Sequence, residues 1–257
     1  MCELFGVTAN RKINVNSYLH KFFRHSKVQP DGWGLALFDD GSISVEKEPV
    51  KASQSKYLEH RLQGKIQSAK MMAHIRKATK GEVNFNNTHP FTAFDESGRR
   101  WVLVHNGTIF DAPVLSKYQY SQQGNTDSER ILLYIVDEVN KRFLEDPCNF
   151  DVNARLELID DIILKLVPGN KVNLLLYDGD YFYVHKNEKG TLYYQEKPGI
   201  VIFATRPLDD EKWTELPMNR LLVYKDGKLV YTGTPHEHEY IYDEEQMKLL
   251  FLDSAAL

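Results

Sequence analysis

The spacing of hydrophobic residues changes twice along the chain. From the N-terminus to residue 105 they form short runs that end in polar residues, a pattern typical of β-strands. Two such runs flank the turn "DDGS" in "WGLALFDDGSISVEK", which predicts a hairpin. Over residues 126–143 hydrophobic residues recur instead at intervals of three and four, which predicts a helix. A second helix is predicted over residues 151–167, directly before Pro168.

Strand-like runs return after the second predicted helix, in "KVNLLLYDGDYFYVHK", "TLYYQE", "GIVIFAT" and "RLLVYKDGKLVYTG". The order of strands, two helices and strands indicates an α+β fold rather than alternating βαβ units. We expect two mainly antiparallel sheets that pack face to face and are flanked by helices. Because no linker rich in proline, glycine or serine divides the chain, we predict a single domain over residues 1–257, with residues 233–257 as a C-terminal tail.

Composition and charge narrow the class of protein. The chain has 257 residues, is 42% hydrophobic and 26% charged, and carries a net charge of -4, which is ordinary for a globular protein. No hydrophobic run is long enough to cross a membrane, and no basic stripe suggests a nucleic-acid partner. The N-terminus does not resemble a secretory signal, and two cysteines are too few for a disulfide scaffold. These features predict a cytoplasmic protein.

The cysteine that follows the initiator methionine is a candidate nucleophile. Removal of Met1 would place a thiol and a free α-amine on one residue, Cys2. An α-amine has an ordinary pKa of about 8, so its neutral form can accept a proton near neutral pH. Such a residue would carry both the nucleophile and the base without a histidine partner. The alternative is a free cysteine buried in a strand, which is common in proteins.

A second candidate lies in "VHNGTIF", where Asn106 and Gly107 follow a hydrophobic run. Asn-Gly favours a type I′ hairpin turn, but the following "TIFD" does not clearly return as a strand. A side-chain amide beside a glycine N–H offers two hydrogen-bond donors at one point. Two such donors are what the oxyanion of a tetrahedral acyl intermediate requires.

Three further motifs each allow two interpretations. Arg76 in "AHIRKATKG" could pair with a carboxylate or lie on the surface. Asp127 in "NTDSE" could accept a substrate ammonium or favour the start of a helix through the helix dipole. The histidines of "PHEHEY" lack a third ligand, so the sequence predicts no metal site and no cofactor.

Six motifs occur together and in order: "MC", "DGWG", "HIRKAT", "NTHPF", "HNG" and "NTDSE". Together they resemble the glutaminase domain of class II glutamine amidotransferases, the N-terminal-nucleophile type. The resemblance is densest from Cys2 to Glu129 and continues more weakly through "VIFATRPLDDEKW", as in the stand-alone, YafJ-like members. It implies a four-layer αββα sandwich of the N-terminal-nucleophile hydrolase type.

The resemblance also implies a role for each candidate residue. It matches Cys2 to the nucleophile, with its own α-amine as the general base. The other matched positions are Asn106 and Gly107 in the oxyanion hole, Arg76 at the substrate α-carboxylate, Asp127 at its α-ammonium, and Thr79 and His89 as residues that line or support the pocket. Lys77 departs from the pattern, because the synthase members carry a tryptophan there that communicates with the attached synthase domain.

The implied activity is hydrolysis of the γ-glutamyl amide bond of glutamine or a γ-glutamyl compound, through a Cys2 thioester that releases ammonia or an amine. No synthase domain or nucleotide-binding motif accompanies the glutaminase-like region. Two alternatives stay open: an ammonia-supplying subunit for a separate synthase partner, and a catalytically idle interaction module. We expect an open pocket beside Lys77, which favours a γ-glutamyl amide hydrolase over a strict glutaminase.

Overall fold

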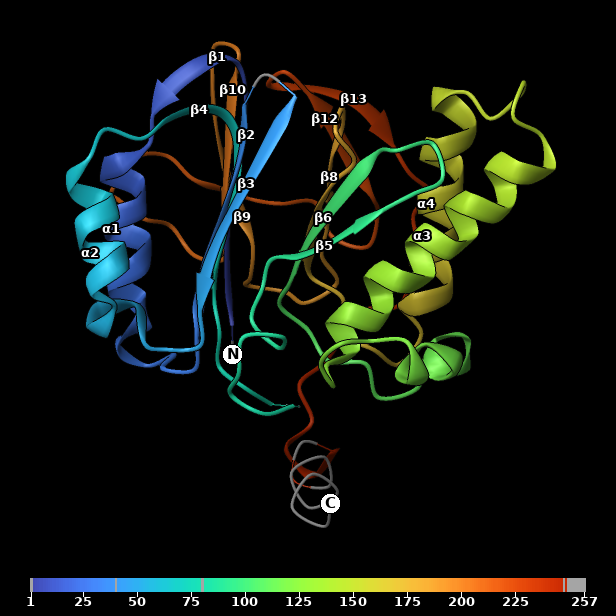
Figure 1. Cartoon of the computed structure of the whole chain (residues 1–257), viewed down its shortest axis with the longest axis horizontal. Helices are drawn as coiled ribbons and strands as arrows, with labels where there is room; N and C mark the ends of the chain where they lie inside the picture. The colour runs from blue at the N-terminus through green and yellow to red at the C-terminus, as the bar shows by residue number, and fades with distance from the viewer. Residues whose placement is uncertain (1, 40, 80, 247, 249–257) are drawn as a thin grey trace.

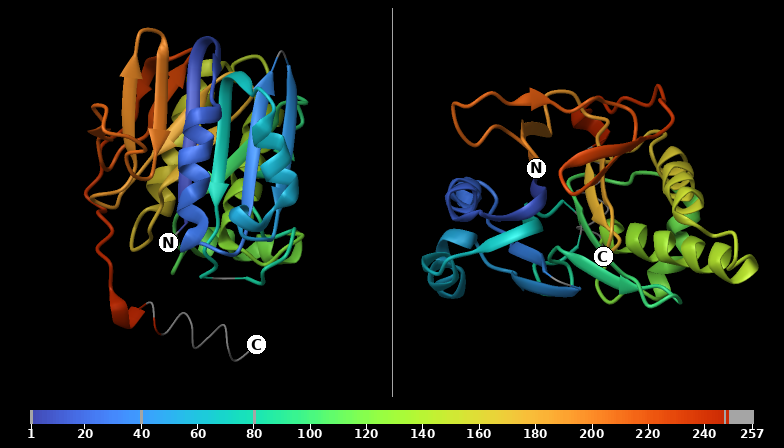
Figure 2. Two further views of the ribbon diagram at one scale, coloured as in Figure 1. Left: turned by 90° about the vertical axis from the view of Figure 1, so that its left-hand side faces the viewer. Right: turned by 90° about the horizontal axis from the view of Figure 1, so that it is seen from above.

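Two antiparallel sheets stack face to face, and helices cover both outer surfaces (Figure 1). The computed structural model describes residues 2–39, 41–79, 81–246 and 248. Within these ranges no helix has the length and hydrophobicity needed to cross a membrane. The arrangement confirms the predicted four-layer αββα sandwich, which Figure 2 shows from above with one helical layer on either side.

The first sheet has seven strands in the described part of the chain. In sheet order they are β11 (Thr214–Glu215), β9 (Tyr193–Lys197), β10 (Ile200–Ala204), β1 (Glu3–Asn14), β4 (Gln67–Ile75), β2 (Trp33–Asp39) and β3 (Ser42–Glu48). The second sheet has six strands in the same described ranges. They are β13 (Lys228–Thr232), β12 (Leu222–Lys225), β8 (Phe182–His185), β7 (Leu174–Tyr177), β6 (Arg100–His105) and β5 (Phe91–Phe94).

Each sheet carries its own pair of helices. The first is covered by α1 (Asn16–Arg24) and α2 (Lys56–Gln63), and the second by α3 (Asp127–Glu145) and α4 (Val152–Leu166) (Figure 1). Short 3₁₀ helices occur at η1 (His25–Lys27), η2 (Ala52–Gln54) and η3 (Pro113–Tyr120).

The two long helices confirm the prediction from hydrophobic spacing, and side-chain caps explain where they begin. The hydroxyl of Thr126 accepts from the Glu129 N–H at the start of α3, and the Asp151 carboxylate accepts from the Ala154 N–H at the start of α4. Both caps satisfy backbone donors that a helix leaves unpaired in its first turn.

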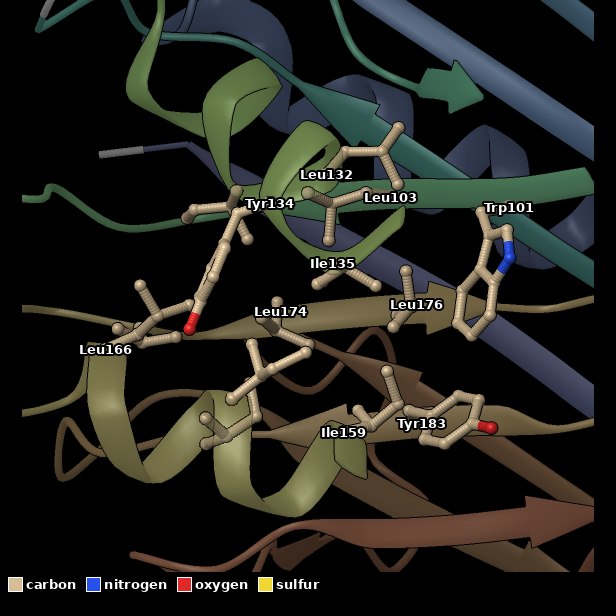
Figure 3. Packing of buried hydrophobic residues seen from close by; sticks show 14 of the residues in the cluster. Trp101, Leu103, Leu132, Tyr134, Ile135, Ile159, Leu166, Leu174, Leu176 and Tyr183 are labelled. Atoms are coloured by element: carbon tan, nitrogen blue, oxygen red, sulfur yellow. The ribbon is translucent and has the colours of Figure 1, made fainter. Parts of the chain in front are cut away.

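Three hydrophobic layers hold the four layers of structure together. One lies between α3, α4 and the second sheet, where Leu132 and Ile135 meet Leu174 and Leu176 (Figure 3). A second lies between the two sheets, and the third lies between the first sheet and α1 and α2. Because side chains alternate along a strand, β1 contributes Leu4 to the layer between the sheets and its other face to the helices. This double burial makes β1 a rigid central strand, with the candidate nucleophile at its start.

Candidate active site

Cys2 lies directly before β1, the central strand of the first sheet, and is only partly exposed. Its sulfur makes two contacts with one residue of the loop that follows β4. The thiol donates to the Lys77 carbonyl oxygen at 3.3 Å, and it accepts from the Lys77 N–H at 3.3 Å. The end of β4 therefore fixes the position of the thiol.

A small cavity of about 30 Å³ opens beside this thiol. Its lining includes Cys2, Thr79, Asn106 and Gly107, which the sequence analysis predicted, and Tyr240 and Tyr242, which it did not. Residues from both sheets thus meet at one end of the sandwich.

Asn106 and Gly107 follow β6 and do not form the hairpin turn that Asn-Gly favours. The Asn106 N–H donates to the Asn173 carbonyl at 2.8 Å, and Thr108 and Lys171 exchange backbone hydrogen bonds at 3.0 and 3.1 Å. The chain therefore pairs with the segment before β7 instead of turning back on β6. Within the described residues the side-chain amide of Asn106 makes no hydrogen bond, although only 3% of Asn106 is exposed.

Position 107 requires a glycine, because the neighbouring atoms leave no room for a side chain. A Cβ atom on it would lie 2.1 Å from the Lys171 carbonyl oxygen and 2.2 Å from His105 Nε2. Real Cβ atoms do not approach backbone atoms this closely, so a side chain would force this segment apart. The glycine keeps the backbone close to Lys171 and places it on the wall of the cavity.

Three buried histidines form a cluster behind the turn at Asn106 and Gly107. His105 Nδ1 lies 2.9 Å from the Ser128 hydroxyl, His74 Nε2 lies 3.2 Å from the His105 carbonyl oxygen, and the ring of His89 stacks on His74 at 4.0 Å. Burial lowers the pKa of His74 to about 3 and lowers the pKa values of His89 and His105 as well. All three rings are therefore uncharged at neutral pH. His89 lies in this supporting cluster and does not line the cavity.

Arg76 and Asp127 lie near the thiol but outside the lining of the small cavity. Arg76 directly follows β4, and its guanidinium donates to the carbonyls of Glu82 at 2.9 Å and Gly81 at 3.2 Å. Asp127 begins α3, and its carboxylate accepts from the Ile109 N–H at 2.8 Å. Burial lowers the pKa of Arg76, whereas the nearby charges of Cys2 and Asp127 raise it, which places all three in one electrostatic neighbourhood.

The "DGWG" turn anchors the loop that holds the thiol. The Asp31 carboxylate accepts from the Ala78 N–H at 2.8 Å, and the Gly32 carbonyl accepts from the Arg76 N–H at 2.8 Å. A Cβ atom on Gly34 would lie 2.0 Å from the His89 carbonyl oxygen, so glycine is also required there. The turn thus connects Arg76 to the loop before β5 that carries His89.

The environment of the thiol keeps it protonated. Burial raises the pKa of Cys2, and the Lys77 N–H, Arg76 and Lys171 offset this effect only in part. A protonated thiol needs a base before it can attack a carbonyl. Burial lowers the pKa values of all three histidines, and none of them lines the cavity at the thiol, whereas the α-amine of Cys2 has an ordinary pKa that suits a base near neutral pH.

Four residues at the cavity escaped the sequence analysis: Thr108, Lys171, Tyr240 and Tyr242. Lys171 is buried and forms an ion pair with Glu188 at 2.5 Å. The tyrosines line the cavity together with Lys77, beside which an open rim was expected, and the openness of that rim stays a prediction. The position of the tyrosines beside "PHEHEY" was the available signal, but it does not show which face of the fold they reach.

The histidines of "PHEHEY" pack against the second sheet. His236 Nε2 lies 3.0 Å from the buried His185 Nε2. In the described part of the chain no group of three or more histidine, cysteine, aspartate or glutamate side chains is arranged to hold a metal ion.

Comparison with known sequences gives one family and several relatives. Residues 1–198 match the family described as "Glutamine amidotransferases class-II". The chain is 32% identical to the uncharacterized protein MJ1515 of Methanocaldococcus jannaschii, over 91% of this chain and 72% of that protein. It is 31% identical to YafJ of Escherichia coli, over 70% of this chain and 71% of YafJ. It is also 25% identical to the gamma-glutamyl-hercynylcysteine sulfoxide hydrolase of Mycolicibacterium smegmatis, over 85% of this chain and 88% of the hydrolase.

The fold also resembles that of solved structures. The glutamine phosphoribosylpyrophosphate amidotransferase of B. subtilis superimposes with a TM-score of 0.64 at 16% identity, over 94% of this chain and 50% of that one. At this identity the likeness concerns the fold alone, and it agrees with the αββα sandwich described above.

Proposed function

The chain belongs to the class II glutamine amidotransferases, and on this basis we propose that it hydrolyses the γ-glutamyl amide bond of glutamine or of a γ-glutamyl compound. One observation carries the proposal: Cys2, the Asn106 amide and Gly107 line the same small cavity. A nucleophile beside two hydrogen-bond donors is the arrangement that acyl transfer needs. The relative from M. smegmatis, named as a γ-glutamyl hydrolase, supports the same bond as the target.

The reaction begins once Met1 is removed. The neutral α-amine of Cys2 takes the proton of the thiol, and the thiolate attacks the γ-carbonyl carbon of the substrate. The Asn106 amide and the Gly107 N–H stabilise the oxyanion of the tetrahedral intermediate. The protonated α-amine then gives its proton to the leaving nitrogen, which departs as ammonia or an amine. Water hydrolyses the remaining γ-glutamyl thioester to glutamate and restores the thiol.

Arg76 and Asp127 are assigned to the amino-acid head of the substrate. Their opposite charges match the α-carboxylate and α-ammonium groups, and both residues are buried close to Cys2. Buried charge pairs of this kind discriminate strongly between substrates. Removing one partner leaves the other charge buried and unpaired, which weakens binding by about 2 to 5 kcal/mol.

The test is an assay of the purified chain alone with glutamine and a series of γ-glutamyl amides, combined with its intact mass. We expect release of ammonia or an amine together with glutamate, from protein whose mass lacks Met1. Active protein that retains Met1 would contradict the α-amine as the base. Turnover that requires a second added protein would favour the ammonia-supplying subunit instead, and no turnover in either case would favour the idle module.

A further inference from the structure

The segment over residues 233–242 has no regular secondary structure, yet backbone hydrogen bonds fix it along the second sheet. The Gly233 N–H donates to the Leu221 carbonyl at 2.8 Å, and the Thr234 N–H donates to Asp160 Oδ2 at 2.8 Å. Figure 1 shows the segment leaving the sheets at the end of the sandwich where the N-terminus lies. The segment therefore carries its last residues toward Cys2.

Asn187 connects the segment to the rest of the fold. Its side-chain amide donates to the His238 carbonyl at 3.0 Å, and its own carbonyl accepts from the Tyr240 N–H at 2.7 Å. A third hydrogen bond, from the His236 N–H to the Asn219 carbonyl at 2.9 Å, lies just before these two. These two hydrogen bonds with the buried Asn187 thus fix the position of Tyr240 along the second sheet.

The same asparagine also holds the segment before β7, which lies behind the turn at Asn106 and Gly107, here called the oxyanion turn. Asn187 Oδ1 accepts from the Val172 N–H at 2.8 Å, and its amide donates to the Asn170 carbonyl at 2.8 Å. That segment leads directly to Asn173, whose carbonyl accepts from the Asn106 N–H. The tyrosine segment and the oxyanion turn are therefore positioned by one shared side chain.

Tyr240 is a fixed part of the cavity wall. It is 8% exposed, and its ring stacks on Phe110 at 6.0 Å with an angle of 11° between the planes. The Phe110 N–H is in turn held by Asn170 Oδ1 at 2.7 Å. Tyr242 lines the same cavity from a more outward position and is 58% exposed. Tyr240 is thus buried against Phe110, and Tyr242 borders solvent.

The cavity between the thiol and the two tyrosines measures about 30 Å³. A water molecule needs roughly 10 to 15 Å³ of such space, so a group the size of ammonia fits beside the sulfur with both tyrosines in place. The nitrogen that leaves the γ-carbonyl must occupy space next to the sulfur that attacks it. Tyr240 and Tyr242, which line this space together with Cys2, are therefore placed to limit the size of the leaving group.

We propose that Tyr240 and Tyr242 are specificity-determining residues that restrict the leaving group to ammonia or a comparably small amine. This inference rests on the proposed function and narrows its substrate class to primary γ-amides such as glutamine. Asn187 acts as a positioning residue, because it sets the place of Tyr240 without reaching the cavity. The restriction is steric and needs the ring of Tyr240, not its hydroxyl.

The first experiment measures kcat/KM for glutamine, γ-glutamylmethylamide and γ-glutamyl-p-nitroanilide. Tyr240→Ala should raise the ratio of p-nitroanilide to glutamine turnover by at least about 10-fold, the scale on which small changes in pocket volume act. Tyr242→Ala should shift the ratio in the same direction by less, and Tyr240→Phe should leave it unchanged. Tyr120→Ala is the matched control, because Tyr120 is 87% exposed and does not line the cavity.

A second measurement keeps this inference separate from the activity itself. Mass spectrometry follows the alkylation of Cys2 by iodoacetamide and by the bulkier N-phenylmaleimide. Tyr240→Ala should accelerate the bulky reagent selectively, whether or not the chain hydrolyses any amide. An unchanged reagent ratio, or a wild-type chain that hydrolyses the p-nitroanilide as fast as glutamine, would overturn the inference. If no γ-glutamyl amide is hydrolysed but the reagent ratio changes in Tyr240→Ala, the proposed function is contradicted. The steric role of Tyr240 at the cavity is then still supported.

Discussion

The two ends of the β-sandwich differ in size and chemistry. The end opposite Cys2 has a hollow of about 790 Å³, bordered by Phe38, Arg99 and Tyr177 among others, whereas the cavity at Cys2 measures about 30 Å³. Charges at the large hollow already pair with each other, as Arg99 and Asp180 do at 2.6 Å. None of its described lining residues is a cysteine or a histidine.

The difference teaches that volume alone is a poor guide to a site in this fold. The same strands reach both ends: β6 runs from Arg100 at the large hollow to His105 beneath the small cavity. At the small cavity the candidate nucleophile Cys2 meets the Asn106 side-chain amide, which has no hydrogen-bond partner among the described residues, and each of the two residues adjoins the end of a strand. Substitutions at the two ends therefore provide a matched comparison within one framework.

Removing the nucleophile should give the largest effect. Cys2→Ala should lower kcat for γ-glutamyl amide hydrolysis by at least about 10⁴-fold, the scale seen when covalent nucleophiles are lost. Cys148→Ala is the control, because Cys148 is exposed in the loop between α3 and α4, and its activity should stay within about 2-fold of wild type. Equal activity in Cys2→Ala and wild type would remove the small cavity from consideration as the active site.

Loss of one oxyanion donor should rank second. Asn106→Ala should lower kcat by about 100-fold and change KM little, because the amide is needed most when charge develops on the carbonyl oxygen. Steady-state kinetics with glutamine separate the two constants. A change confined to KM would show that Asn106 binds the ground state and is not an oxyanion donor.

The two head-group residues should come third. Arg76→Ala and Asp127→Asn should each lower kcat/KM by about 30-fold, which corresponds to about 2 kcal/mol. Asparagine is chosen at position 127 because its amide oxygen can still accept the Ile109 N–H while the charge is lost. A normal kcat/KM for glutamine in both variants would contradict the assignment of these residues to the substrate's charged groups.

The smallest effect is expected at the opposite end. Arg99→Ala breaks the ion pair with Asp180, which is 47% exposed, so the free energy of unfolding should fall by no more than about 1 kcal/mol. The kcat/KM should remain within about 2-fold of wild type. Urea unfolding and the glutamine assay measure these quantities. A large loss of activity here would break the comparison by linking the large hollow to function.

Sequence alone gave the long elements and the residues with unusual chemistry. The helices α3 and α4 span several turns, so their hydrophobic spacing is unmistakable, and a strand-ending Asn-Gly or a second-position cysteine is conspicuous by itself. The short elements could not be predicted from the sequence. The buried face of α2 consists of Leu58 and Leu62, too few positions to establish a helical period. Strand β11 covers two residues and gives no alternation at all.

The missed part of the site has a different cause. Tyr240 reaches the cavity because Asn187 fixes a segment without regular structure, and Lys171 reaches it by pairing with Thr108. Neither contact follows from periodicity or from a local motif, since each joins positions far apart in the chain. The catalytic and binding roles of Cys2 and the other predicted residues stay predictions until the variants above are measured.

The connections of Asn187 have a consequence for the motion of the backbone. Its side chain and backbone join Val172, Asn173, His238 and Tyr240 in one hydrogen-bonded unit, and none of these bonds can open far without disturbing the others. In amide hydrogen exchange, such a unit opens cooperatively, so its protons exchange with a common free energy of opening. The N–H groups of Val172 and Tyr240 should therefore exchange together, although 68 positions separate them in the sequence (240 minus 172). Asn187→Ala should accelerate both, and the oxyanion turn would then fluctuate with the segment that carries the tyrosines.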